Sequence, residues 1–352
     1  MPNRDNPRKE TDARNQDFIR FEQIEKSQDY RLAEGEVGDE EFDETFEIQT
    51  VSMSLPKAEF AARLGAALED IGFCILVDHG VDPKLYEEAG QRVLDMVGDR
   101  ALEEKMRFCA ARFGSINQGY FPIEETSDIH PDLVEGWVLC RRAFDLGDRD
   151  DYEAADFWPD ATFEQFFRRV YLAQEPLILP IVQGVLTHLG CDPHLFDERL
   201  ADTNFALRLN YYPPVPDAAP DGAGRLLGHE DVTLITMLPA PTIEGLQVLN
   251  RRNMKWIRLT PPKGSIVLNT GDYMQRITND RLPSTTHRVS RPRDPVMLHR
   301  SRVSFPMNVY LWEDEMLEVL PGLGEPKYPP VRAEEFHTRI TSKYYGDDYV
   351  SE

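Results

Sequence analysis

The feature that most constrains the fold is a series of short β-type segments that begins near Asn204. They are rich in branched and aromatic residues, and Pro, Gly, Asn and Asp separate them, as is typical of strands joined by turns. The segments are 206–212, 232–238, 246–249, 256–259, 265–268, 285–289 and 302–312. This spacing predicts a sandwich or a jelly roll. We favour the double-stranded β-helix, or jelly roll, because its strands can each point a side chain into the space between two sheets.

The half of the chain before Asn204 has a mainly helical pattern. Apolar residues recur at spacings of three and four from Phe60 to Ile71, which predicts one apolar stripe on a helix. Gly72 then breaks the period, and 73–77 is an apolar run typical of a short buried strand. Further helices are predicted over 83–97 and 163–189. The expected fold is therefore mainly β with flanking helices, with a jelly-roll core and a helical N-terminal half.

We expect the chain to be organised in four regions. These are an acidic, mobile N-terminal arm (1–46), a helix-rich region packed on the core (47–203), the jelly-roll catalytic core (204–312) and a C-terminal helical segment (313–352). The arm is distinguished by its charge, since seven of the eleven residues from Glu34 to Glu44 are acidic. Such a run buries too little apolar surface to offset the entropy of ordering it.

The overall charge and the cysteines bear on the partners of the protein. A formal net charge of −23 over 352 residues argues against a nucleic acid or an anionic membrane as a partner, because like charges repel. No apolar run approaches the roughly 20 residues that span a bilayer, and the first thirty residues do not resemble a secretory signal peptide. The four cysteines show no Cys-x-x-Cys spacing and are expected to be free thiols. We therefore expect a cytoplasmic protein with a small-molecule partner.

Three residues are of the types that form a metal site. His229 and Asp231 lie two apart, so in a strand they share a face, and His287 would have to arrive from a distant strand. Two imidazoles and one carboxylate on one side of a metal are the ligand set of non-haem Fe(II). That set leaves positions open for oxygen and for an organic ligand.

Two other predicted strands present polar side chains on one face each. Arg208, Asn210 and Tyr212 point in one direction by strand alternation. Arg302, Ser304, Asn308 and Tyr310 also share a face, provided that Pro306 causes no bulge.

In this order along the chain, these segments resemble the isopenicillin N synthase-type family of Fe(II)- and 2-oxoglutarate-dependent dioxygenases. The resemblance covers roughly Leu55 to Trp312. Besides the two histidine segments, its motifs are Gly72-Phe73, Asp78-His79-Gly80, Gln118-Gly119-Tyr120-Phe121, Asn210-Tyr211-Tyr212-Pro213, Gly245-Leu246-Gln247-Val248 and Asn269-Thr270-Gly271-Asp272.

The resemblance implies a role for each matching residue. His229, Asp231 and His287 would be the catalytic iron ligands. Arg302 and Ser304 would hold the distal carboxylate of 2-oxoglutarate, which suits the fixed fork of a guanidinium and the short donor of a hydroxyl. Tyr212 would also bond this cosubstrate, and Asn210 would lie beside the metal.

The implied reaction uses Fe(II), 2-oxoglutarate and O2 to oxidise a small organic metabolite, with release of succinate and CO2. Hydroxylation, desaturation and ring closure all remain open. The candidate substrate residues are Arg208, Tyr120, Asn308 and Tyr310. The substrate itself is open among an amino acid, a small peptide, a phenolic compound and a terpenoid acid.

Two alternatives compete with this interpretation, and one departure from the family pattern needs an explanation. An Fe(II) oxidase of the same fold would use no 2-oxoglutarate, and Arg302 and Ser304 would then hold a substrate carboxylate. A non-catalytic, ligand-binding jelly roll is the other alternative. The departure is the separation of 15 residues between His287 and Arg302, for which we expect an extended hairpin.

Overall fold

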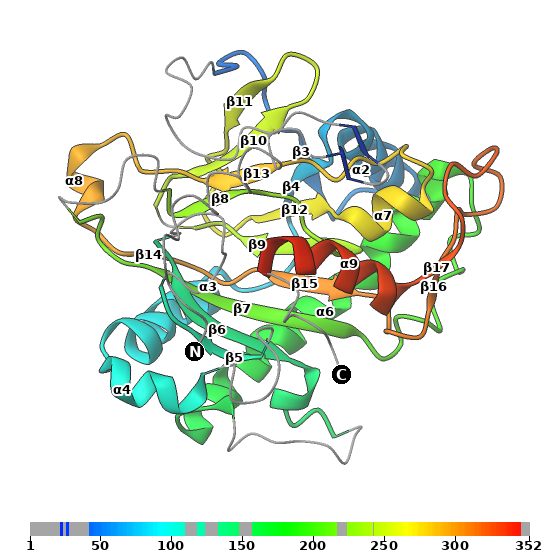
Figure 1. Ribbon diagram of the computed structural model, residues 1–352. Coiled ribbons are helices and arrows are strands. Elements are labelled where there is room, and N and C mark those ends of the chain that lie inside the picture. Colours follow the sequence, from blue (N-terminus) through cyan, green and yellow to red (C-terminus); the bar gives the residue numbers. More distant parts are fainter. Residues whose placement is uncertain are drawn as a thin grey trace.

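In the computed structural model, the described residues are 22–23, 26–27, 42–109, 118–123, 133–147, 157–216, 224–241 and 243–345. Two β-sheets form the centre of this part of the chain (Figure 1). The smaller sheet has the order β11 (Lys255–Arg258), β10 (Leu246–Asn250), β13 (His287–Val289) and β8 (Leu226–His229). All its neighbouring strands are antiparallel.

The larger sheet combines strands from both halves of the chain. Its order is β3 (Thr50–Ser52), β4 (Phe73–Val77), β12 (Ile266–Thr270), β9 (Ile235–Pro239), β15 (Met307–Tyr310), β7 (Asn204–Tyr212), β6 (Glu135–Cys140) and β5 (Gly119–Phe121), and β14 (Arg302–Ser304) also pairs with β7. Only β3 and β4 run parallel to each other. The helix-rich region of the sequence therefore also contributes strands to the sheet of the core.

The jelly-roll core with a helical N-terminal half is confirmed. Each of the seven segments predicted as strands contains one, although the last is divided into β14 and β15. Strand β8 was not predicted. Its four residues, Leu-Leu-Gly-His, follow a stretch of Pro, Asp, Ala and Gly and are too few to show a period of two.

Helices cover the larger sheet. The predicted helices are present as α2 (Lys57–Ile71), α3 (Pro83–Val93), which continues into the π-helical turn Leu94–Gly98, and α6 (Ala161–Leu189). Helix α2 ends at Gly72, whose positive φ of 73° is the left-handed conformation that a helix terminus favours for glycine. Shorter helical segments are α4 (Leu102–Lys105), Met106–Phe108, Arg141–Ala143, α7 (Asp272–Ile277) and α8 (Pro295–Leu298).

Helix α6 corrects one expectation about apolar runs. Among the described helices it is long and apolar enough to cross a membrane, although no such run was expected. However, 56% of the most apolar stretch of this helix is buried inside the protein. Its Gly184 lies so close to α2 that an added Cβ would stand 3.1 Å from Phe60 and 3.3 Å from Leu64. The apolar composition of α6 is thus accounted for by packing in the core.

The ends of the described chain pack on the two sheets. Phe42 forms a β-bridge with Trp256, and the carboxylate of Asp43 accepts hydrogen bonds from Asn250 (3.0 Å) and Asn253 (2.8 Å). Apart from β1 (Glu22–Gln23) and β2 (Lys26–Ser27), the arm before Phe42 lies outside the described residues. After the core come β16 (Met316–Leu317), β17 (Val331–Arg332) and α9 (Ala333–Tyr345), and α9 crosses in front of β9 and β15 (Figure 1).

The connection from His287 to Arg302 is not the expected hairpin. Strand β13 belongs to the smaller sheet, whereas β14 pairs with β7 of the larger one. The chain between them therefore crosses from one sheet to the other and contains α8. Val215 donates a backbone hydrogen bond of 2.9 Å to the carbonyl of Leu298, which attaches this connection to the segment after β7.

The cysteines have the predicted state. All four are free: Cys74 and Cys109 are buried, and Cys140 and Cys191 are partly buried. Burial raises the pKa of the Cys140 thiol to about 12, so it is protonated at neutral pH.

Candidate metal and cosubstrate site

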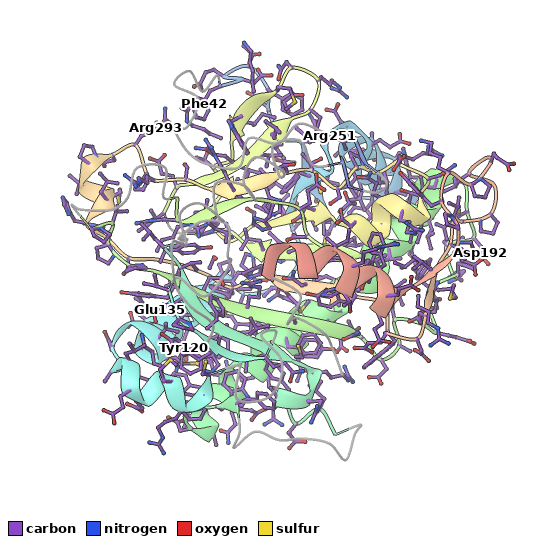
Figure 2. The ribbon with its side chains drawn as sticks, in the orientation of Figure 1. Phe42, Tyr120, Glu135, Asp192, Arg251 and Arg293 are labelled. Carbon is purple, nitrogen blue, oxygen red and sulfur yellow. The ribbon has the colours of Figure 1, made fainter. Side chains whose placement is uncertain are left out.

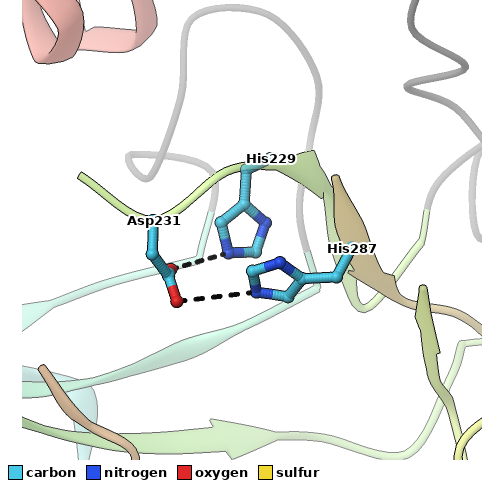
Figure 3. Close-up of side chains that lie close together, drawn as sticks. All are labelled: His229, Asp231 and His287. Carbon is cyan, nitrogen blue, oxygen red and sulfur yellow. Dashed lines mark ion pairs between the residues drawn. The ribbon is translucent and has the colours of Figure 1, made fainter. Parts of the chain in front are cut away.

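The three predicted metal ligands converge at one end of the smaller sheet (Figure 3). His229 ends β8, Asp231 follows in the loop, and His287 begins β13 directly opposite His229. The Nε2 atoms of His229 and His287 lie 3.7 and 3.9 Å from the two carboxylate oxygens of Asp231. The ligand atoms of the three residues all lie within 4.8 Å of one another. One ion could therefore contact all three.

Neighbouring groups orient His287 and Asp231 and affect the ionisation of Asp231. Nδ1 of His287 donates a hydrogen bond of 3.2 Å to the carbonyl of Thr285, which leaves Nε2 with a free lone pair. Asn269 donates from Nδ2 to Oδ2 of Asp231 at 2.8 Å. Burial opposes ionisation of Asp231, but His287, His229 and the bond from Asn269 together hold its pKa below the usual value. A carboxylate beside two imidazoles fits a divalent ion such as Fe(II).

We predict that Asn269→Ala weakens Fe(II) binding without abolishing it. The substitution removes the hydrogen bond that orients Asp231 but removes no ligand, and such supporting groups typically contribute about 10- to 100-fold in metal affinity. The measurement is an anaerobic Fe(II) titration. Asn253→Ala is the matched control, because Asn253 lies in the turn between β10 and β11 and donates to Asp43 instead of Asp231. An unchanged affinity in Asn269→Ala would contradict this role.

The predicted cosubstrate residues lie together across β7 and β14. The register runs without a break from the pair Tyr212–Arg302 to the pair Asn204–Tyr310, and the amide of Arg208 donates to the carbonyl of Pro306 at 3.0 Å. Pro306 therefore causes no bulge, and the predicted common face is present.

Side-chain contacts join these residues into one group. The hydroxyl oxygens of Tyr212 and Ser304 are 3.4 Å apart, and Asn210 donates from Nδ2 to the Ser304 hydroxyl at 3.5 Å. The guanidinium carbon of Arg302 lies 4.7 Å from the centre of the Tyr212 ring. Asn210 is thus placed against Ser304, and its role beside the metal stays a prediction.

Arg302 has the properties expected of a carboxylate anchor. It is 1% exposed, and its Nε donates to the carbonyl of Ile243 at 3.2 Å. Its Nη1 and Nη2 have no hydrogen-bond partner among the described residues. Burial lowers the pKa of Arg302, and Tyr212 opposes this shift. A buried, charged fork with two unsatisfied nitrogens is costly unless an anion binds it, so the site fits the carboxylate of a ligand.

Three of the four substrate candidates continue along the same face. Arg208 stands opposite Pro306, and its guanidinium carbon lies 5.3 Å from the centre of the Phe121 ring. The Oδ1 atom of Asn308 is buried without a partner among the described residues. Tyr310 is close enough to both Asp231 and Arg208 for their charges to affect its pKa, which burial raises well above its usual value.

Tyr120, the fourth candidate, lies on the other side of the sheet. It pairs with Trp137, which pairs with Leu209, and these residues face the helical core. Its hydroxyl donates to Glu135, and both residues are labelled in Figure 2. Glu135 also forms an ion pair of 2.6 Å with Lys105. The structure therefore corrects this assignment. The pattern of so short a strand did not show which of its faces points inward.

Two residues that were not predicted lie near the candidate cosubstrate and substrate residues. Phe121 pairs with Gly136, which pairs with Asn210, so Phe121 shares the face of the cosubstrate residues. His337 comes from α9, where its Nδ1 is 3.2 Å from the Tyr273 hydroxyl and its ring centre 5.6 Å from that of Tyr310. Alternation in β5 separates Phe121 from Tyr120 without showing which of them faces the site, and nothing in the sequence singles out His337.

Comparisons with known proteins agree with this geometry. Residues 203–307 match the 2OG-Fe(II) oxygenase superfamily, and residues 46–161 match the N-terminal region described as non-haem dioxygenase in morphine synthesis. The 2-oxoglutarate-dependent dioxygenase ucsF of Acremonium sp is 27% identical over 82% of this chain and 95% of its own length. The 2-oxoglutarate-dependent dioxygenase citB of Monascus ruber is 31% identical over 64% of this chain and 71% of its own.

A solved structure gives the same result for the fold. A 2OG-Fe(II) oxygenase family protein from Caulobacter crescentus superposes with a TM-score of 0.72 at 30% identity, covering 85% of this chain and 99% of that one. The chain therefore belongs to the isopenicillin N synthase-like superfamily of Fe(II)- and 2-oxoglutarate-dependent dioxygenases, and it is an oxygenase of a small metabolite with Fe(II), 2-oxoglutarate and O2 as its cofactors and cosubstrates.

Proposed function

We propose that His229, Asp231 and His287 hold Fe(II), and that Arg302, Ser304 and Tyr212 hold the distal carboxylate of 2-oxoglutarate. The observation that carries this assignment is the buried fork of Arg302, whose two terminal nitrogens lack partners among the described residues. Ser304 and Tyr212 offer hydroxyl donors beside it. Iron and 2-oxoglutarate supply the oxidising chemistry when bound, and the protein supplies position and exclusion of water.

The protein groups have separable tasks in this proposal. The three ligands would occupy one side of the metal and leave the other side to cosubstrate, oxygen and substrate. Asn269 keeps Asp231 oriented and ionised. The bond from His287 to Thr285 sets the imidazole tautomer that can bind a metal.

The substrate side would favour a largely apolar molecule with few polar groups. Its face of β5, β6 and β7 contains a buried apolar cluster, which consists of Phe121, Val134, Val138, Ala206, Tyr212 and Val289. Asn308 adds a buried acceptor, Arg208 a positive charge, and Tyr310 a hydroxyl at the edge of this cluster. A phenolic compound or a terpenoid acid suits this combination better than an amino acid or a small peptide does. With a net charge of −23, we also propose that the protein binds neither nucleic acid nor an anionic membrane.

The experiment that tests the proposed function is a turnover screen. The Fe(II)-loaded protein is incubated with 2-oxoglutarate and a library of small metabolites, and succinate and oxidised product are quantified by mass spectrometry. A true substrate raises succinate above the uncoupled background and yields product in equal amount. If no tested class of compound raises succinate, and the wild-type protein binds no 2-oxoglutarate under argon, the proposal is wrong.

A further inference from the structure

A second buried arginine lies beside the proposed cosubstrate site. Arg225 immediately precedes β8, four residues before His229, and it is 0% exposed. Its amide donates to the carbonyl of Val289 on β13 at 3.0 Å, and the neighbouring carbonyl of Gly224 accepts from Leu133 at 3.1 Å. The backbone at Arg225 is thus held between two other segments.

The side chain of Arg225 uses little of its hydrogen-bonding capacity. Nη2 donates to the carbonyl of Arg300 at 2.8 Å. Nε and Nη1 are buried and have no partner among the described residues. Within the described part of the chain, no carboxylate forms an ion pair with Arg225 or with Arg302. Together the two arginines therefore present four unsatisfied nitrogens.

The two guanidinium groups are close enough to repel each other. Burial lowers the pKa of Arg225, and the positive charge of Arg302 lowers it further, to about 10, while Tyr212 opposes the shift. Tyr212 is also the residue whose ring lies under Arg302, so both cations adjoin the same side chain. The carbonyl that binds Arg225 belongs to Arg300, two residues before Arg302.

This arrangement is costly in the protein alone. Burying two like charges that repel each other disfavours the folded state, because neither charge has a counter-ion among the described residues. A carboxylate bound between them would satisfy the free nitrogens with charge-assisted hydrogen bonds and cancel part of the repulsion. The pair therefore has the form of an anion site.

We propose that Arg225 is a second anchor for the distal carboxylate of 2-oxoglutarate and acts together with Arg302. This inference rests on the proposed function, since it assumes that Arg302 faces that carboxylate. It adds that the cosubstrate end of the site carries two positive charges, one from the start of β8 and one from β14. The site would accordingly discriminate strongly against 2-oxo acids that lack a distal carboxylate.

The test compares two ligands that differ only at the distal end. Dissociation constants for 2-oxoglutarate and for 2-oxopentanoate, in which a methyl group replaces the distal carboxylate, are measured by calorimetry with Fe(II) under argon. We expect Arg225→Met to weaken 2-oxoglutarate by about 10-fold or more, the loss of one charge-assisted hydrogen bond. Binding of 2-oxopentanoate should change less than about twofold, and Arg225→Lys should restore part of the loss, because it keeps the charge without the fork.

Thermal unfolding gives a second readout that does not depend on activity. Because Arg225→Met removes a buried repulsion, the ligand-free variant should unfold at the wild-type temperature or above it, while 2-oxoglutarate should raise its Tm by less than it raises that of the wild type. Arg276→Met is the matched control. Arg276 belongs to α7, is 2% exposed and donates to the carbonyl of Pro329 at 2.6 Å. Its replacement should therefore not change the preference between the two ligands.

The outcomes separate this inference from the proposed function. Equal weakening of both ligands in Arg225→Met would mean a purely structural role and would overturn the inference. Unchanged 2-oxoglutarate binding in Arg225→Met, with weakened binding in Arg302→Met, would also overturn it and leave the proposed function intact. Failure of the wild-type protein to prefer 2-oxoglutarate over 2-oxopentanoate would refute the proposed function itself.

Discussion

Replacing His287 by alanine is expected to abolish both Fe(II) binding and turnover. The three candidate ligands lie within 4.8 Å of one another, and loss of one leaves two anchors, too few to hold the metal in place. His229→Ala and Asp231→Ala should have the same effect. Asp231→Glu should also damage activity, because the longer side chain displaces the oxygen that Asn269 orients. The measurements are iron content after dialysis and succinate production.

The matched control for these variants is His194→Ala. His194 is an exposed histidine that pairs with Asp197 at 2.8 Å in the segment between α6 and β7, and its replacement should leave iron content and turnover unchanged. Full activity of the His287→Ala protein would refute the metal-site assignment. If the variant bound iron normally but made no succinate, His287 would be a site residue of another kind.

Arg302→Ala is expected to weaken 2-oxoglutarate by about 10- to 100-fold or more, since a charge-assisted hydrogen bond contributes about 1.5–3 kcal/mol. Both terminal nitrogens of Arg302 are available for a carboxylate. Fe(II) occupancy should change little, because Arg302 is not a ligand. Arg302→Lys should recover only part of the affinity, because a lysine offers a point charge and no fork. The measurement is the dissociation constant of 2-oxoglutarate by calorimetry with Fe(II) under argon, with Arg276→Ala as the control.

One result would reassign Arg302. If Arg302→Ala left the dependence on 2-oxoglutarate untouched and raised the requirement for the organic substrate, Arg302 would bind the substrate. The roles of Arg225 and Arg302 would then have to be considered together, because the two charges lie close to each other.

The polar face of the candidate cosubstrate site could be predicted from the sequence because strands hold its residues, whereas Asp231 lies in the loop after β8. Alternation of side chains along a strand is imposed by the backbone, so the common face of Arg302, Ser304 and Asn308 followed from their spacing, provided that Pro306 caused no bulge. The unbroken register past Pro306 agrees with it. The three candidate ligands were predictable for a different reason: two histidines and one carboxylate are the residue types that bind non-haem Fe(II).

Other predictions failed where a local sequence pattern does not determine which strands pair with each other. Alternation separates Tyr120 from Phe121, but only the pairing of β5 with β6 and β7 decides which of them faces the site. The segment between His287 and Arg302 was expected to be a hairpin. It crosses between sheets because β13 pairs with β10 and β14 pairs with β7, a choice that involves residues far away in the sequence.

The amino-acid sequence by itself thus indicated the strand-rich jelly-roll core, the three candidate metal ligands and the face that carries Arg302, because periodicity and side-chain chemistry are local properties. Only the tertiary structure decided that the charge of Arg302 acts on Arg225, that Phe121 and not Tyr120 shares the face of Asn210, and that α9 brings His337 near Tyr310. These contacts join segments that are distant along the chain. They arise from the packing of two sheets and a C-terminal helix, which no single stretch of sequence specifies.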